Sequence, residues 1–513
     1  MKKISETSAF LEIANQVQMK LGGIGLDHHR KERPDGDYII FEATAPSPFI
    51  FNAVADINKA LDDDNHYKDR LVVSKRKSKP TSRLALPEVK LFRREVSESL
   101  TVDQNTFGDD FLERYTPSVS NLEELVVSNA NCIVYGRRGA GKSSLLGYAM
   151  HQVKRSGNRH CWVAMQTFNG RKDPQVLASV LSEIVNAIGL VGGNATEAES
   201  LRSSLDTIGE GDLSKTQVRE KISRLTPRIR RLVSSIASPQ KTFTIFIDDL
   251  HLLAFDLQPE FLSGIYAIAR GNSTYIKASG IEQLSNPWDS AKNLGFQAPH
   301  DAQTLKLDYN LTMPHKSLEH IEGILDAHAK FCGLPNIRYL IEDAALSRLI
   351  LVAAAVPRDA LSLFSQGISK ALIKGQKNIT VTAINAAAAE ASQTKMQEIQ
   401  NDLPTDDNTI HSLLEKVKNF CIIEKRTNSF LLKINPSDRN FETMQKLVAL
   451  RLIHTLHEGI TRSRAGEGYQ ALMLDFGFYV GIRAARSVKI FPSDLSQLLA
   501  KDLRRLPVFE SSI

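Results

Sequence analysis

A glycine-rich stretch between a short apolar run and a helix-forming run constrains this chain more than any other feature. Cys132–Tyr135 has the residues of a buried strand, and the next eight residues, Gly136–Ser143, fit the spacing GxxxxGK[ST]. The glycines let consecutive backbone N–H groups turn toward one anion, and the helix expected after Ser143 adds the positive end of its dipole. The stretch therefore predicts an α/β fold with a phosphate-binding loop at the edge of a parallel sheet.

The residues of this loop have distinct expected roles. Lys142 is expected to bridge the β- and γ-phosphates of a nucleotide, and the hydroxyl of Ser143 is expected to bind Mg²⁺. The residues expected to contact ATP are Gly136, Arg137, Arg138, Gly139, Ala140, Gly141, Lys142, Ser143 and Ser144. ATP and Mg²⁺ are therefore the predicted ligands.

A second apolar run, roughly 100 residues further along, ends in two acidic residues. Phe243–Ile247 predicts a buried strand whose carboxyl end carries Asp248 and Asp249. Asp248 is expected to hold Mg²⁺, through water, and Asp249 to orient or deprotonate the water that attacks the γ-phosphate. Together with the loop, this pair predicts ATP hydrolysis.

The regions around these motifs alternate between strands and helices, which is typical of a parallel sheet covered by helices. The sheet strands are expected at 131–135, 160–166, 242–247, 273–278 and 304–309. The expected domains are a small α+β unit of unknown role over 1–74, a basic linker over 75–104, the P-loop core over 105–312, an all-helical lid over 313–400 and a last domain over 408–513. No internal repeat is recognised.

In this order the parts resemble the AAA+ ATPases, and within them the initiator clade that includes origin-recognition proteins. The resemblance covers about 110–395. It implies that Ser279, at the end of the fourth strand, is a sensor 1 residue that contacts the γ-phosphate or the attacking water. It also implies that Arg358, in the run Val356–Leu361, is a sensor 2 residue at the start of a lid helix. The catalytic set implied is Lys142, Asp249, Ser279 and Arg358.

The chain departs from the family pattern in three places. Asp249 stands where most members carry Glu, and its shorter side chain predicts low turnover. The segment between Lys277 and Asn336 contains no arginine, so the usual arginine finger is absent there, and Arg270 or Lys292 are the alternatives. Residues 190–240 insert extra helices, one of which is expected to start at Thr226-Pro227.

The last domain predicts a ligand as well as a fold. A helix over 408–420, a strand, a second helix over 440–453 and a hairpin resemble the winged helix that initiator-clade ATPases carry after the lid. Residues 409–513 hold 16 Lys and Arg against 10 Asp and Glu, and the hairpin tip carries Arg462 and Arg464 as candidate DNA contacts. The prediction is an ATPase that acts as a nucleotide-dependent switch on duplex DNA.

Composition leaves other partners open. A formal net charge of +6 allows a polyanionic partner without requiring one. The alternative is a signalling or scaffold ATPase similar to the STAND group, for example in bacterial phage defence, whose terminal domains bind protein partners; self-association also stays open. Four scattered cysteines without metal-ligand spacing predict a cytoplasmic location, and no apolar run reaches the roughly 20 residues of a membrane span.

Overall fold

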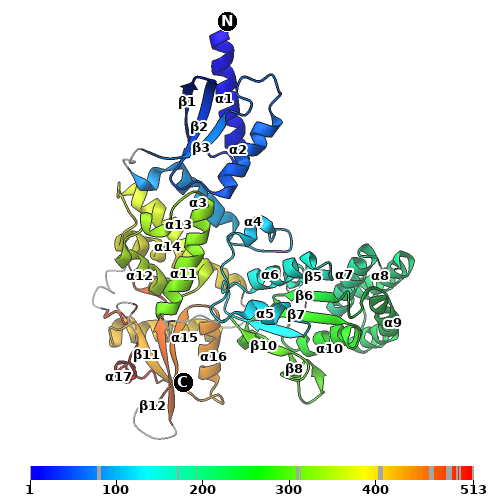
Figure 1. Cartoon of the computed structure of the whole chain (residues 1–513). Coiled ribbons are helices and arrows are strands. Elements are labelled where there is room, and N and C mark those ends of the chain that lie inside the picture. Colours follow the sequence, from blue (N-terminus) through cyan, green and yellow to red (C-terminus); the bar gives the residue numbers. More distant parts are fainter. Residues whose placement is uncertain are drawn as a thin grey trace.

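The structure is a computed structural model with four parts, which follow one another along the chain (Figure 1). It describes residues 2–77, 82–169, 171, 173–192, 194–307, 311, 314–402, 408–461, 467–480, 488–492, 495 and 498–510, and the side chains of these except for 2–8, 393–402 and 408. Among the described residues, no helix combines the length and the apolar character needed to cross a bilayer. In Figure 1 the N-terminal unit lies above the lid, the sheet domain to one side and the C-terminal domain below.

A five-stranded sheet forms the centre of the second part, in the order β10-β4-β7-β6-β5. Its strands are β4 (Cys132–Tyr135), β5 (Arg159–Ala164), β6 (Phe243–Asp248), β7 (Thr274–Gly280) and β10 (Gln303–Lys306). Every neighbouring pair is parallel, and every residue of β6 is buried, as expected for a strand covered on both faces. The predicted parallel sheet is confirmed.

Helices cover this sheet, and the three helices that lie between β5 and β6 in the sequence pack against one another beside β5. The helices are α4 (Asp109–Leu112), α5 (Leu122–Val127), α6 (Lys142–Arg155), α7 (Val176–Leu190), α8 (Ala195–Glu210), α9 (Lys215–Ile236) and α10 (Gln258–Ala269), and a small hairpin joins β8 (Trp288–Asp289) to β9 (Leu294–Gly295). The predicted helix start at Thr226-Pro227 is wrong, because α9 runs through Pro227 without interruption. Its start is a capping box at Ser214 and Gln217, which satisfies the first free N–H groups of the helix.

In its described residues the lid is built from helices, as predicted. Its members are α11 (Pro314–Phe331), α12 (Asp343–Val352), α13 (Pro357–Ile373) and α14 (Val381–Asp402). Their apolar faces belong to one continuous hydrophobic core that also contains residues of the N-terminal unit and of the C-terminal domain. The sheet domain has separate cores on the two faces of its sheet. The lid is therefore packed more intimately with the terminal domains than with the sheet domain.

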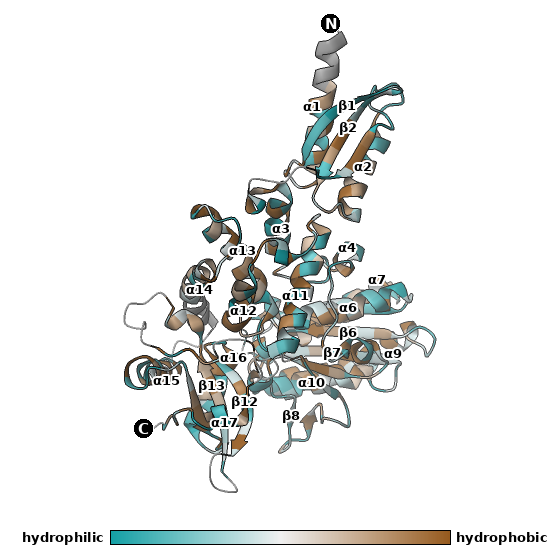
Figure 2. Ribbon diagram, turned by 60° about the vertical axis from the view of Figure 1, so that its left-hand side comes forward, coloured by the Kyte–Doolittle hydropathy of each residue, from teal (hydrophilic) through white to brown (hydrophobic). Residues whose placement is uncertain are grey.

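The N-terminal unit is the predicted small α+β fold. It contains α1 (Lys2–Lys20), β1 (Asp27–Arg33), β2 (Gly36–Ala43), α2 (Pro48–Ala60) and β3 (Leu71–Lys75), with the sheet order β1-β2-β3. The edge strand β1 is exposed along its length and hydrophilic, whereas β2 carries the buried apolar residues (Figure 2). Charged edge strands resist pairing with other chains.

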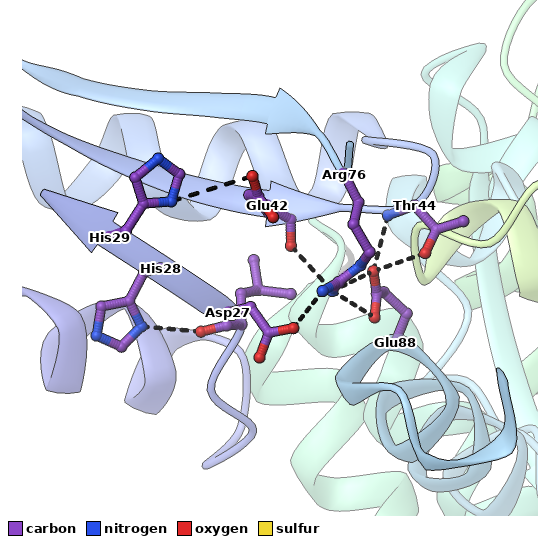
Figure 3. Close-up of polar contacts among 8 residues, drawn as sticks. Asp27, His28, His29, Glu42, Thr44, Arg76 and Glu88 are labelled. Atoms are coloured by element: carbon purple, nitrogen blue, oxygen red, sulfur yellow. Dashed lines mark hydrogen bonds and ion pairs between the residues drawn. The ribbon is translucent and has the colours of Figure 1, made fainter. Parts of the chain in front are cut away.

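The expected linker over 75–104 is corrected by a helix that packs into the core. This helix, α3 (Pro87–Glu98), places Phe92 edge-on against Phe364 of the lid. Arg76 forms an ion pair with the fully buried Glu88, which also accepts a hydrogen bond from the backbone N–H of Thr44 (Figure 3). The many basic residues of this segment predicted a solvated linker, but α3 also carries a row of buried apolar residues. Through these residues the segment packs the N-terminal unit against the lid.

The C-terminal domain has the helix–strand–helix–hairpin order of the predicted winged helix. It contains α15 (Asn408–Lys418), a π-helical turn (Asn419–Glu424), β11 (Ser429–Lys433), α16 (Arg439–Ala449), β12 (Ile453–Thr461), β13 (Gly468–Leu474) and the short α17 (Ala500–Leu503). The sheet is antiparallel in the order β11-β13-β12. Arg462 and Arg464, the predicted wing contacts, lie outside the described residues.

Candidate functional site

The glycine-rich loop joins β4 to α6 in the conformation that its glycines permit. Gly139 and Gly141 have φ values of +80° and +96°, in the left-handed region that other residues rarely adopt. Lys142 is the first residue of α6, and its buried Nζ donates a hydrogen bond to the carbonyl oxygen of Arg137 at 3.3 Å. The lysine is thus folded back over the loop, where a phosphate chain would lie.

Two acidic residues and a serine meet where β6 and β7 end. The hydroxyl of Ser279 donates to Oδ1 of Asp248 at 2.6 Å and accepts from the backbone N–H of Asp249 at 2.9 Å. Ser279 is completely buried, and it lies on the strand next to β6. The serine therefore fixes both acidic residues in place, a positioning role that its place in the sequence did not indicate.

Burial gives Asp248 unusual acid–base properties. Removal from water, and secondly the negative charge of Asp249, raise the pKa of Asp248 to about 6, against the opposing effects of Ser279, Ser143 and Lys142. A buried carboxyl held next to a second carboxyl and a serine hydroxyl is a set of hard oxygen donors, which Mg²⁺ prefers. The residues present therefore fit a divalent cation held by Ser143 and Asp248.

His251 is a site residue that the sequence analysis missed. Its Nδ1 lies 3.8 Å from Oδ1 of Asp249, and its side chain lines a cavity together with Lys142 and Asp248. Burial, the largest effect, lowers the pKa of His251 to about 4, so the imidazole is neutral at pH 7. The sequence signal that could have indicated His251 was its position two residues after Asp249.

The start of α13 brings the lid against the loop. The backbone N–H of Arg358 donates to the carbonyl oxygen of Gly139 at 3.2 Å. A Cβ added at Gly139 would lie 2.8 Å from Cβ of Arg358, so glycine is required there for close packing as well as for its φ. The predicted sensor 2 arginine therefore lies directly beside the phosphate-binding loop.

One cavity of about 1070 Å³ joins these groups. The predicted residues that line it are Arg138, Gly139, Ala140, Gly141, Lys142, Ser143, Ser144, Asp248, Asp249 and Arg358. Tyr115 and His320 contribute from the segment before β4 and from the lid. The C-terminal domain also lines it, through residues of α16 and through Arg451, which no sequence signal indicated.

The remaining predicted positions lie around this cavity or outside the described structure. Arg137 points to the lid, where its guanidinium donates to the carbonyl oxygen of Ala354 at 3.2 Å. Arg270 lies over the ring of Tyr266, and Lys292 forms an ion pair with Asp289 at 2.7 Å. Neither of these last two cations lines the cavity of its own chain, so an arginine-finger role stays a prediction.

Comparison with known proteins identifies the part of the chain that holds the phosphate-binding loop and the Asp248–Asp249 pair. Residues 121–271 match the family model described as an AAA ATPase domain, so this part of the chain is an AAA+ domain. The predicted resemblance to AAA+ ATPases is thereby confirmed.

Individual relatives are distant. An uncharacterized HTH-type transcriptional regulator of Methanocaldococcus jannaschii is 23% identical over 308 residues, which cover 56% of this chain and 70% of the relative. Among solved structures, the Aeropyrum pernix ORC1 protein in complex with DNA is similar at 16% identity and a TM-score of 0.37, with 75% of this chain and 93% of that chain covered. CDC6P from Pyrobaculum aerophilum is similar at 13% identity and a TM-score of 0.33, with 73% and 94% covered.

Proposed function

We propose that this protein binds ATP with Mg²⁺ and hydrolyses it slowly. The observation that carries the proposal is the convergence, in one cavity, of Lys142, the Asp248–Asp249 pair and Arg358. Each of these groups matches a part of the phosphoryl-transfer reaction, in which positioning and neutralisation of charge supply nearly all of the catalysis.

The side chains divide the reaction between them. Asp249 accepts a proton from, or orients, the water that attacks the γ-phosphorus, and ADP leaves on the opposite side. Lys142 and Arg358 place positive charge beside the transferred phosphate, and Ser279 keeps Asp249 in place through its backbone. Mg²⁺, when held by Ser143 and Asp248, would neutralise part of the phosphate charge.

Low turnover is expected from the geometry of Asp249. Its side chain is one methylene shorter than Glu, and its backbone is in the left-handed region with φ of +61°. A conformation of this kind is kept only where the surroundings enforce it, and here the hydrogen bond to Ser279 does so. The backbone of Asp249 is therefore fixed, so its short side chain must reach the water from one backbone position.

We further propose that the ATPase acts as a nucleotide-dependent switch on duplex DNA through its C-terminal domain. The helix–strand–helix–hairpin order of that domain and the excess of basic residues over 409–513 support this. The relative described as an HTH-type transcriptional regulator points in the same direction.

Two measurements test these proposals separately. Calorimetric titration with a non-hydrolysable ATP analogue and Mg²⁺ should show one site per chain, and a cavity that stays empty at millimolar analogue contradicts the ATPase proposal. Filter binding of duplex DNA at several salt concentrations should show retention that falls steeply with salt. Retention that is absent at every salt concentration contradicts the DNA proposal alone.

A second candidate is a scaffold ATPase whose C-terminal domain binds a protein. It is favoured by one observation, namely that α16 packs against the sheet domain. This candidate predicts a nucleotide-dependent change of particle mass with a protein partner, and no affinity for DNA.

A further inference from the structure

The C-terminal domain reaches the nucleotide cavity through α16. Glu442 and Lys446 lie on one face of this helix, four residues apart, Leu450 follows at the same spacing at its C-cap, and all three line the cavity. The opposite face, with Met444 and Leu447, is buried in the core of its own domain. The outward face of α16 is therefore turned toward the ATPase site, and α16 also contacts the short helix η4 (Glu282–Leu284) of the sheet domain. In Figure 1, α16 lies on the side of the C-terminal domain next to the sheet domain.

An ion pair fixes α16 to the lid at the residue next to the sensor 2 arginine. Arg451, just after the end of α16, pairs with Asp359, and the two side chains are only 7% and 11% exposed. Asp359 follows Arg358 directly in the first turn of α13. The contact joins residues 92 positions apart, so it depends wholly on how the domains pack.

The backbone at Arg451 indicates that this side chain is needed. Its φ is +64°, at a position after a helix where glycine is usual, because other residues are strained there. Its Nε is buried and has no hydrogen-bond partner within the part of the chain that the structure describes. Arg451 therefore occupies a strained backbone position, and its Nε–H remains a hydrogen-bond donor without a partner among the described residues.

The lid and the C-terminal domain also share one hydrophobic core, whereas the sheet domain has its own. Closure of the lid on the sheet domain must therefore carry α16 with it. The Arg451–Asp359 ion pair connects that movement to the adjacent Arg358, whose backbone N–H donates to the carbonyl oxygen of Gly139 in the phosphate-binding loop.

We infer that Arg451 is a positioning residue that couples the nucleotide site to α16, so that closure over ATP covers the outward face of α16. In a winged helix this face of the second helix enters the major groove of DNA. ATP and duplex DNA on α16 are then antagonistic, and by thermodynamic linkage each weakens the other by the same factor. The inference rests on the proposed DNA switch, but its structural half can be tested without DNA.

The structural test measures the distance between the sheet domain and the C-terminal domain. Spin labels on Lys241→Cys and Glu458→Cys suit this, because both positions are exposed and all four native cysteines are buried. With a non-hydrolysable ATP analogue, the wild-type background should give one narrow distance distribution, and Arg451→Gln should broaden it. A distribution that Arg451→Gln leaves unchanged overturns the inference, whatever DNA does.

The functional test measures DNA affinity with and without the analogue, by anisotropy of a labelled duplex. The wild type should bind DNA about tenfold more weakly with the analogue, whereas Arg451→Gln and Asp359→Asn should reduce that ratio to near one. The double variant Asp359→Arg, Arg451→Asp, which swaps the two charges, should restore the wild-type ratio of DNA affinities. Affinity that rises with the analogue overturns the antagonism, and the reciprocal loss of analogue affinity on adding DNA must show the same factor.

Controls separate coupling from loss of folding. Arg224→Gln removes an exposed arginine on α9 that pairs with Glu220, and it should leave the ratio unchanged. Arg451→Gly keeps the backbone conformation without strain and removes only the ion pair, so it should uncouple while the fold is retained. If no duplex binds in any state while the distances respond as expected, the DNA proposal fails and the coupling of α16 to the nucleotide site stands.

Discussion

The two walls of the nucleotide cavity are built in different ways. One wall consists of the phosphate-binding loop and the ends of β6 and β7, which adjacent hydrogen-bonded strands hold in register. The other consists of the lid and α16, which meet the first wall through contacts such as Arg358 to Gly139. The strand-end wall is held by the sheet, which suits chemistry, whereas the helical wall belongs to a hydrophobic core separate from those of the sheet domain, which suits regulation.

The largest effect is expected at Asp249, on the fixed wall. Asp249→Asn removes the carboxylate that orients the water but keeps its shape, so turnover should fall about 1000-fold. ATP affinity should change little, as measured by titration with a non-hydrolysable analogue. The exposed Asp256→Asn is the matched control. Turnover equal to that of the parent would show that Asp249 has no catalytic role.

Loss of Lys142 should mainly affect binding. Lys142→Ala removes a charged donor from the phosphates, and the dissociation constant of the analogue should rise about 100-fold. Lys154→Ala, in the exposed last turn of the same helix, should leave binding unchanged. Similar weakening by both variants would indicate a general loss of charge and not a specific contact.

Asp248 should reduce stability in the absence of Mg²⁺. Because its pKa is raised from 3.8 to about 6, the folded state binds a proton more tightly than the unfolded state, and the free energy of unfolding falls as pH rises from about 4 to 6. Asp248→Asn should therefore stabilise the metal-free protein at pH 7, by about 3 kcal/mol. Urea denaturation of the parent and of Asp248→Asn at pH 5 and pH 7 measures this gain in the free energy of unfolding. An equal gain at pH 3 would show that the raised pKa of Asp248 is not its cause.

The smallest effect is expected on the movable wall. Arg358→Ala should weaken binding of the ATP analogue about tenfold, because the lid loses one cation toward the phosphate but keeps its own core. Arg358→Lys should recover part of the loss. If Arg358→Ala equals Lys142→Ala in effect, the two walls act as one rigid unit and the comparison fails.

Much of the fixed wall could be predicted from the sequence. Phosphate-binding loops require glycine where φ is positive, as at Gly139 and Gly141, so the motif and the geometry coincide. The buried apolar runs before the loop and before Asp248 predicted two strands of one sheet, which are β4 and β6. These features are local, because a few consecutive residues determine each of them.

Other features depended on contacts that no local pattern encodes. The basic composition of 75–104 suggested a linker, yet Val89, Phe92 and Val96 lie on a buried face of α3, which only packing against the lid reveals. The start of α9 was misplaced because Pro227 lies inside a helix whose neighbours support it. The bonds of the Ser279 hydroxyl to Asp248 and to the backbone N–H of Asp249 join two strands, so no local pattern encodes them, and the sensor 1 role of Ser279 stays a prediction.

Sequence alone determined the order of three features: a phosphate-binding loop, a strand that ends in two acidic residues, and a helical lid. Each of them follows from residue chemistry and spacing along a short stretch. Only the tertiary structure decided that Arg451 of the C-terminal domain meets Asp359 beside Arg358. That contact crosses a domain boundary, and each buried charge needs the other because an unpaired buried charge is costly, a requirement that no single segment contains.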